Sequence, residues 1–129
     1  RMAAQGQNGG WLRVEIIAAT AKYRGLPPGW AYEVATFYSM SDLAPVGRNN
    51  VAFCTNISCW LNGAEGIVRH CENKLGIKHG ESTPDGRIFH TVEEECLAAC
   101  SAAPMMVVDG HYHERLTTEN VAALLDGLE

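Results

Sequence analysis

Four of the five cysteines occur as two pairs, and this arrangement constrains the fold and the chemistry of the chain more than any other feature. Cys54 and Cys59 have four residues between them, and Cys96 and Cys100 have three. An odd number of cysteines cannot form a closed disulfide framework, and a chain without a secretory signal more often uses such residues for metal or redox chemistry. The two pairs therefore direct attention to a metal or cluster site.

Each pair lies where a short loop is expected beside a strand. The apolar run Val51-Ala52-Phe53 predicts a buried strand ending at Cys54, and residues 87–92 predict a strand leading to Cys96. A 2Fe-2S cluster needs four thiolates on irregular loops whose backbone N–H groups can point at sulfur. The sequence therefore predicts one 2Fe-2S cluster, held by Cys54, Cys59, Cys96 and Cys100.

Two other kinds of cysteine site remain open at this point. A zinc site of four thiolates accepts similar pairs, although its first pair is usually closer in sequence, and the chain would then be an interaction module stabilised by zinc. A dithiol redox site needs Cys-x-x-Cys at a helix N-terminus, and neither pair has that spacing. The fifth cysteine, Cys71, lies between Val68 and Leu75 on a predicted apolar helix face, so we expect it in the core.

Apolar periodicity predicts a helical subregion over residues 1–46. Its first helix carries an apolar stripe and is closed by Gly25, and its second begins at Pro28 and reaches about Met40. The predicted stripe of the first helix consists of Leu12, Ile16, Ala19 and Tyr23. The apolar face of the second consists of Trp30, Val34, Phe37 and Tyr38.

Residues 47–129 predict an α/β, thioredoxin-like domain. The strand at residues 51–53 is followed by one helix over residues 57–75 that ends at Gly76, and then by the strand at residues 87–92. Asp109-Gly110 predicts a two-residue hairpin, and Thr117 predicts the cap of a last helix. The order is a βαβ unit followed by ββα, which is the thioredoxin-like plan.

The net charge of the chain and the absence of several motifs exclude some classes of function. The net charge of -5 and the scattered Lys and Arg residues argue against a nucleic-acid partner. The chain has no apolar run long enough for a membrane span, and its start lacks the apolar core of a signal peptide, so we expect a soluble intracellular protein. It also has no phosphate-binding loop or dinucleotide motif. These absences favour an electron carrier over a complete enzyme.

Six stretches of the sequence match the pattern of a known family. They are residues 32–38 (Tyr-Glu-Val-Ala-Thr-Phe-Tyr), Cys54-x4-Cys59-Trp-Leu, residues 80–86 (Gly-Glu-Ser-Thr-Pro-Asp-Gly), residues 95–100 (Glu-Cys-Leu-x-Ala-Cys), Ala103-Pro-Met105 and Leu116-Thr117. On these stretches, the chain resembles the small 2Fe-2S subunit of NADH:quinone oxidoreductase, respiratory complex I, over essentially its whole length.

The resemblance implies a role and partners. It implies that the four paired cysteines hold the cluster, and that the chain pairs as a heterodimer with a flavoprotein subunit that binds FMN and oxidises NADH. It also implies a peripheral position on the cytoplasmic side of the bacterial inner membrane, or on the matrix side in mitochondria. Homologous subunits serve NAD-linked formate dehydrogenases and NAD-reducing hydrogenases, which are the alternative assignment.

The chain departs from the family pattern at the second cysteine pair and elsewhere. Ala98 stands where the family usually has glycine, and we expect strain of about 1 kcal/mol if that position needs a positive φ. Ser41 replaces an aromatic residue, and Ile57-Ser58 replaces Thr-Pro. The acidic run at residues 93–95 leads directly into Cys96, and we expect its charge to oppose reduction of a cluster held there.

Overall fold

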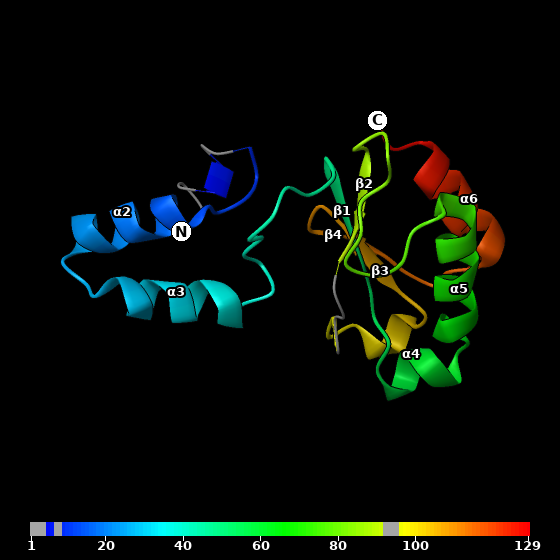
Figure 1. The fold of residues 1–129 in the computed structure, drawn as a ribbon. Coiled ribbons are helices and arrows are strands. Elements are labelled where there is room, and N and C mark those ends of the chain that lie inside the picture. Colours follow the sequence, from blue (N-terminus) through cyan, green and yellow to red (C-terminus); the bar gives the residue numbers. More distant parts are fainter. Residues whose placement is uncertain (1–4, 7–8, 92–95) are drawn as a thin grey trace. The chain divides into compact units, whose positions relative to one another are not determined.

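The computed structural model describes residues 5–6, 9–91 and 96–129 (Figure 1). The chain divides into two compact units, one that ends at Val46 and one that spans Gly47–Glu129. Each unit has its own hydrophobic cluster of buried residues. In the described part of the chain, no helix has both the length and the apolar character required to cross a membrane.

The first unit is a pair of helices, α2 (Val14–Arg24) and α3 (Pro28–Phe37). Gly25 ends α2 in the left-handed conformation, with φ of 68°, and its N–H donates to carbonyls of the last turn. Pro28 occupies the first position of α3, where its missing N–H has no cost. The two predicted helices and their junction are confirmed, although α3 ends at Phe37 and not near Met40.

The buried face of the helix pair differs from the predicted stripe. Ile17 and Ala21 are the buried residues of α2, whereas Tyr23 is 89% exposed. Of the predicted stripe, Leu12 is buried just before the helix and Ile16 packs against the same cluster, whereas Ala19 and Tyr23 are exposed. On α3 the small residue Ala35 is buried, and the predicted face of Trp30, Val34, Phe37 and Tyr38 is exposed.

The second unit is built on a four-stranded sheet with the order β2-β1-β3-β4. Its strands are β1 (Asn49–Phe53), β2 (Ile88–His90), β3 (Met106–Val108) and β4 (His111–His113). β1 pairs with β2 in parallel and with β3 in antiparallel orientation, and the β3–β4 hairpin turns at Asp109-Gly110 as predicted. β2 is shorter than the strand predicted over residues 87–92, and residue 92 lies outside the described residues.

Two helices, α5 (Ala64–Leu75) and α6 (Thr118–Asp126), contribute to the core of this sheet (Figure 1). The core consists of Val51, Phe53, Ile67, Cys71, Ile88, Met106, Val108, Leu116, Val121 and Leu125. α6 starts with the predicted cap, because the Thr117 hydroxyl accepts from the N–H of Asn120 at 3.2 Å and the Asn120 side chain accepts from the N–H of Thr117 at 2.8 Å. A Lys74–Asp126 ion pair at 2.8 Å joins α5 to α6.

The helix predicted over residues 57–75 is wrong as one element, because the structure divides it into α4 (Ile57–Leu61) and α5. Gly63 lies between them with φ of 87°, a conformation that a helix interior does not allow. The Asn62-Gly63 dipeptide is a common turn signal, which the continuous apolar period concealed. Because the helix breaks at Gly63, α4 has an orientation of its own, in which Ile57 and Leu61 are exposed and Cys59 is buried.

We predict opposite effects from two glycine substitutions near this break. Gly63→Ala lowers the free energy of unfolding by about 1 kcal/mol, because alanine resists a positive φ. Gly66→Ala raises it by a few tenths to about 1 kcal/mol, because Gly66 is helical and an added Cβ meets no atom within 4 Å. Urea unfolding of both variants measures the difference. Equal effects would contradict the role of Gly63 as the helix-breaking residue.

Candidate functional site

The four paired cysteines come from two short stretches of the second unit, residues 54–59 and residues 96–100. Cys54 directly follows β1 and Cys59 lies in α4, whereas Cys96 lies in a loop and Cys100 begins the short 3-10 helix η1 (Cys100–Ala102). Cys54 and Cys59 are 2% and 1% exposed, but Cys96 and Cys100 are exposed. All five cysteines of the chain are free thiols. The site therefore has a buried pair and a solvent-facing pair.

Backbone hydrogen bonds fix these segments. The N–H of Cys54 donates to the carbonyl of Met105 at 3.2 Å, which joins the end of β1 to the start of β3. The side chain of Asn56 accepts from the N–H of Ile57 at 2.7 Å and caps α4. Behind η1, the N–H of Arg115 donates to the carbonyl of Ala102 at 2.9 Å. The loops that carry the cysteines are thus held by the sheet and its connections.

The sulfur atoms interact with one another. Burial would raise the pKa of the Cys54 thiol, but hydrogen bonds from the backbone N–H groups of Leu97 and Asn56, and contacts with the thiols of Cys59 and Cys96, bring it below its usual value. Burial, followed by the hydrogen bond with Cys54 and then by the charge of Cys54, raises the pKa of Cys59 to about 11. The charge of Cys100 also acts on Cys59. Cys54 thus has Cys59 and Cys96 as neighbours, and the charge of Cys100 is near enough to influence Cys59.

Backbone N–H groups point at several of these sulfurs. Besides the donors to Cys54, the N–H of Met105 donates to Cys59, and the N–H of Ala98 donates to Cys96 Sγ at 3.4 Å. Such donors stabilise negative charge on thiolate sulfur. Cys54 and Cys59 pack with Ala64 and Met105, and this cluster is bordered by Leu97, Ala99, Ala103 and Val107. An apolar border with inward N–H dipoles fits an anionic metal–thiolate group.

The described residues do not form a preassembled metal site. Among residues 5–6, 9–91 and 96–129, no group of three or more His, Cys, Asp or Glu side chains is arranged to hold a metal ion. A zinc site with four thiolates needs all of them around one point, whereas a 2Fe-2S cluster spreads its four thiolates over two irons. Four thiolates in two pairs are the donor set that a 2Fe-2S cluster uses.

Cys71 is separate from this group. It is 1% exposed in the core between α5 and the sheet, and burial raises the pKa of its thiol to about 12. The core position predicted for Cys71 is confirmed. Of the other sequence features, the acidic run at residues 93–95 lies outside the described residues, so the structure does not place it relative to the cysteines.

Ala98 has a positive φ of 59°, as the replacement of a usual glycine suggested. This conformation lies in the left-handed region, where a Cβ costs energy. It accompanies the N–H contact from Ala98 to Cys96 Sγ. The loop therefore accepts strain at Ala98 while its N–H is directed at a thiol.

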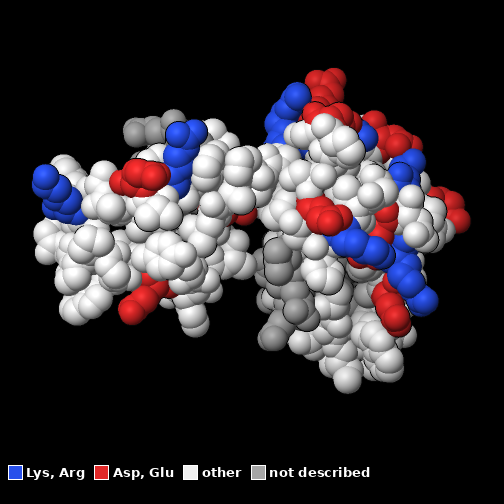
Figure 2. All heavy atoms as spheres, viewed as in Figure 1, with Lys and Arg blue, Asp and Glu red and all other residues white. Residues whose placement is uncertain are grey.

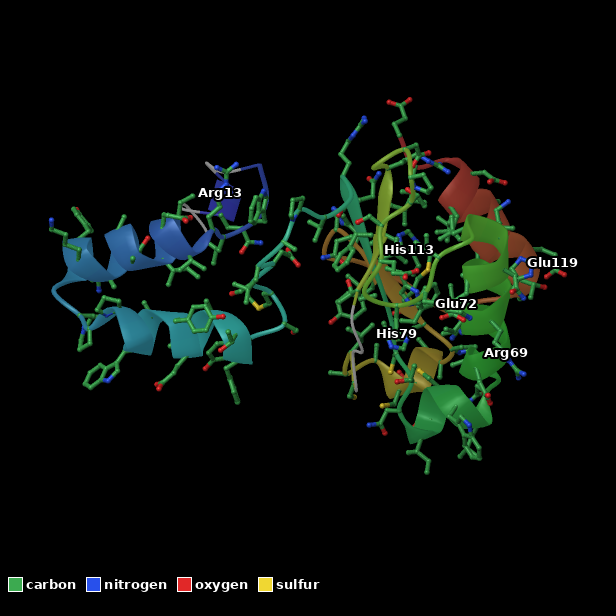
Figure 3. All side chains as sticks on the ribbon, in the orientation of Figure 1. Arg13, Arg69, Glu72, His79, His113 and Glu119 are labelled. Atoms are coloured by element: carbon green, nitrogen blue, oxygen red, sulfur yellow. The ribbon has the colours of Figure 1, made fainter. Side chains whose placement is uncertain are left out.

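A cavity beside the site, lined by both apolar and polar side chains, was not predicted from the sequence. It has a volume of about 250 Å³ and is lined by Phe53, Thr55, Val68, His79, His90 and Thr91. His90 is 5% exposed, and its burial lowers its pKa although the Glu72 carboxylate opposes this shift. His79 and Glu72 lie on the side of α5 that faces the sheet, whereas Arg69 and Glu119 point away from it (Figure 3). Nothing in the sequence indicated that His79 and His90 would line the same cavity.

Comparison with known proteins places these features in a family. The model of the family described as thioredoxin-like [2Fe-2S] ferredoxin matches residues 2–129. An NADH-quinone oxidoreductase subunit of Rickettsia bellii (strain RML369-C) is 47% identical over 125 residues, which cover 97% of this chain and 74% of the relative. NADH dehydrogenase [ubiquinone] flavoprotein 2, mitochondrial, of Dictyostelium discoideum is 43% identical over 126 residues, covering 98% of this chain and 51% of that protein.

Solved structures share the fold. A crystal structure of NAD+-reducing [NiFe]-hydrogenase in the air-oxidized state matches with a TM-score of 0.80 and 25% sequence identity, over 96% of this chain. The match spans only 22% of the hydrogenase chain. The H2-reduced state of that type of enzyme gives the same TM-score of 0.80. The α/β thioredoxin-like fold class predicted from the sequence is confirmed.

We predict that the strain at Ala98 can be relieved without loss of the fold. Ala98→Gly raises the free energy of unfolding of the metal-free chain by up to about 1 kcal/mol, because glycine accepts the positive φ and keeps the N–H. Ala99→Gly is the matched control, since Ala99 has φ of −122° and gains nothing from glycine. Thermal unfolding compares the two. A stabilising Ala99→Gly with a neutral Ala98→Gly would contradict the proposed strain.

Proposed function

Since this chain belongs to the thioredoxin-like [2Fe-2S] ferredoxin family, we propose that it carries one 2Fe-2S cluster on Cys54, Cys59, Cys96 and Cys100 and transfers electrons as a subunit of NADH:quinone oxidoreductase. The observation that carries this proposal is the placement of the four cysteines, two at the end of β1 and on α4 and two on the loop that continues into η1, with the N–H of Ala98 directed at Cys96 Sγ at 3.4 Å. The names of the most similar relatives support the choice of enzyme. The chain is then part of an oxidoreductase and not a complete enzyme.

When bound, the cluster accepts and donates one electron at a time. The chain's own residues hold it and set its surroundings. The N–H groups of Leu97, Ala98 and Met105 offset its negative charge, and the apolar side chains around the buried pair limit access of water. Cys96 and Cys100 are exposed, so electrons reach the site most directly from their side.

The partner in this proposal is a flavoprotein subunit that binds FMN and NADH and forms a heterodimer with this chain. The relatives are named as parts of larger enzymes, which supports a partner of this kind. The first unit exposes large apolar side chains, with Trp30 at 62% and Phe37 at 78% exposed, and such surfaces commonly meet other proteins. We place the subunit peripherally, on the cytoplasmic side of a bacterial inner membrane or the matrix side in mitochondria.

A second candidate is the equivalent subunit of an NAD-linked formate dehydrogenase or NAD-reducing hydrogenase. The structural match to a hydrogenase favours this assignment, although its 25% identity is lower than the 47% identity to the Rickettsia bellii protein. The zinc-stabilised interaction module has no support from either the relatives or the solved structures. The two remaining candidates share the cluster and differ in the electron acceptor.

We predict that the ligand set can be separated from the core cysteine by substitution. Cys54→Ala, Cys59→Ala, Cys96→Ala and Cys100→Ala each lose the normal cluster. Cys71→Ser keeps the cluster but loses about 1–3 kcal/mol of stability, because it buries a hydroxyl among apolar side chains. Iron, acid-labile sulfide and the visible spectrum of each purified variant measure the outcome.

Two results would contradict this assignment. One is cluster loss in Cys71→Ser together with a normal cluster in any of the other four variants. The other is a colourless wild-type protein that contains zinc, since zinc has no redox chemistry and absorbs no visible light in a thiolate site. A brown protein that bleaches on reduction meets the expectation.

We also predict that the chain forms a stable heterodimer with a flavoprotein subunit and does not oxidise NADH alone. Co-expression of the two subunits followed by size-exclusion chromatography tests the pairing. Phe37→Ser is expected to weaken the heterodimer without unfolding the chain, because its side chain is 78% exposed. Glu33→Gln, also on an exposed part of α3, is the control. NADH oxidation by the isolated, flavin-free chain would overturn the proposed division of roles.

A further inference from the structure

Residues 78–82, which we call the strap, lie against β2 and engage both backbone groups of His90. The N–H of Gly80 donates to the carbonyl of His90 at 2.7 Å. The N–H of His90 donates in turn to the carbonyl of Glu81 at 3.0 Å. Both hydrogen bonds have to break before the strap can move away from β2.

The side chains of the strap contact the same histidine and the helix α5. The rings of His79 and His90 meet edge to face with their centroids 6.2 Å apart, and both line the cavity of about 250 Å³. The Lys78 ammonium group pairs with the Glu72 carboxylate of α5 at 3.1 Å. The strap is thus tied to α5 by an ion pair, and to β2 by the backbone and the ring of His90.

His90 is the buried titratable group of this junction. It is 5% exposed, and its ring packs against the uncharged ring of Phe53 on β1, with the centroids 5.2 Å apart. Its imidazole forms no hydrogen bond to any residue that the structure describes. A buried charge without a hydrogen-bonding partner is costly, so this position favours the neutral ring. Uptake of a proton by His90 therefore favours any rearrangement that brings the ring to water.

The charged groups around His90 do not offer it a free partner. On α5, the Glu72 carboxylate is already paired with Lys78. In the strap, the Glu81 carboxylate accepts the N–H of Lys78 at 2.7 Å. His79 adds a second imidazole beside the first. Once both rings are protonated, three positive groups surround the single Glu72 carboxylate, and their mutual repulsion opposes the closed arrangement.

From these contacts we propose that the strap opens in acid: below about pH 6, proton uptake by His79 and His90 releases it from β2 and gives water access to the cavity. Opening hydrates the ring of His90 and separates the like charges. Phe53 and Thr55 also line the cavity and flank Cys54 in the sequence, so water then reaches the segment beside the first paired cysteine. The inference does not depend on what the cysteines hold.

Proton linkage gives the direction of the effect. Burial lowers the pKa of His90, the Glu72 carboxylate opposes this shift, and His79 adds to it. In the open form the ring faces water, where a histidine has a pKa of about 6.5. The open form therefore binds the proton more tightly than the closed form. Closure is stable above about pH 6.5 and is lost as the pH falls through the lower pKa of the closed form.

Amide hydrogen exchange of the full chain, followed by NMR at about pH 7 and about pH 5, tests the proposal. Protection factors remove the intrinsic effect of pH on exchange. We expect the Gly80 and His90 amides to lose at least about tenfold in protection at the lower pH. The Asp109 amide, which donates to the carbonyl of Asn50, is expected to keep its protection. Unchanged protection at Gly80 and His90, or an equal loss at all three amides, would overturn the inference.

Three variants separate proton uptake from other effects of acid. His90→Phe keeps an aromatic ring beside Phe53 but cannot take up a proton, so it is expected to abolish most of the acid-induced loss at Gly80. His79→Gln changes an exposed residue and leaves the core intact, and it is expected to reduce the loss severalfold. His111→Phe, at an exposed position on β4, is the control and is expected to keep the wild-type loss. A full wild-type loss in both His90→Phe and His79→Gln would refute the role of the histidines.

The ring signal of His90 gives an independent measurement. We expect its Cε1–H resonance to titrate at a lower pH than that of a histidine in an unfolded peptide, and over the same pH range in which the Gly80 amide loses protection. Titration at the pH of the peptide, with the protection of Gly80 unchanged, would show that the closed cavity accepts a protonated ring. That result would also overturn the inference.

Discussion

The joint between the end of β1 and the start of β3, closed by the N–H of Cys54 and the carbonyl of Met105, is the interaction on which the site depends. β1 is a central strand with a neighbour on each side, and its Val51 and Phe53 are buried, so the sheet holds its end firmly. Met105 in turn directs its N–H at Cys59. One short segment thus fixes the backbone of one thiol and the electrostatic environment of another.

The N–H donors of the site come from backbone that is already held by the fold. Asn56 caps α4, and Met105 adjoins β3, so their dipoles do not have to reorient when the charge of a bound group changes. Preorganised dipoles of this kind stabilise charge without a cost of reorganisation. A rigid donor set around the buried pair therefore suits electron transfer, while the exposed pair leaves one side of the site accessible. On the visible face of this unit, Lys and Arg side chains alternate with Asp and Glu side chains in its upper and right-hand part (Figure 2).

Sequence patterns predicted the order of the elements, the Thr117 cap, the Asp109-Gly110 turn and the buried Cys71, because each depends on local spacing or on one residue type. The sequence patterns failed where a short turn signal or helix start interrupted a longer apolar period. The apolar period through residues 57–75 concealed the break at Gly63, and the helical period begun at Leu12 predicted Leu12 and Ile16 correctly but missed the buried Ile17 and Ala21. The His79–His90 cavity was missed because it depends on contacts between distant segments.

The break at Gly63 gives α4 an orientation that a continuous helix would not allow. Within this one short helix Cys59 is buried, whereas Ile57, Trp60 and Leu61 are 66%, 56% and 70% exposed. The described side chains of α4 carry no charge. Substitutions on the exposed face of α4 can therefore occur without changing its buried face. A change among the outer apolar residues, made to suit a different neighbouring protein, leaves the inward-facing thiol of the same helix where it is.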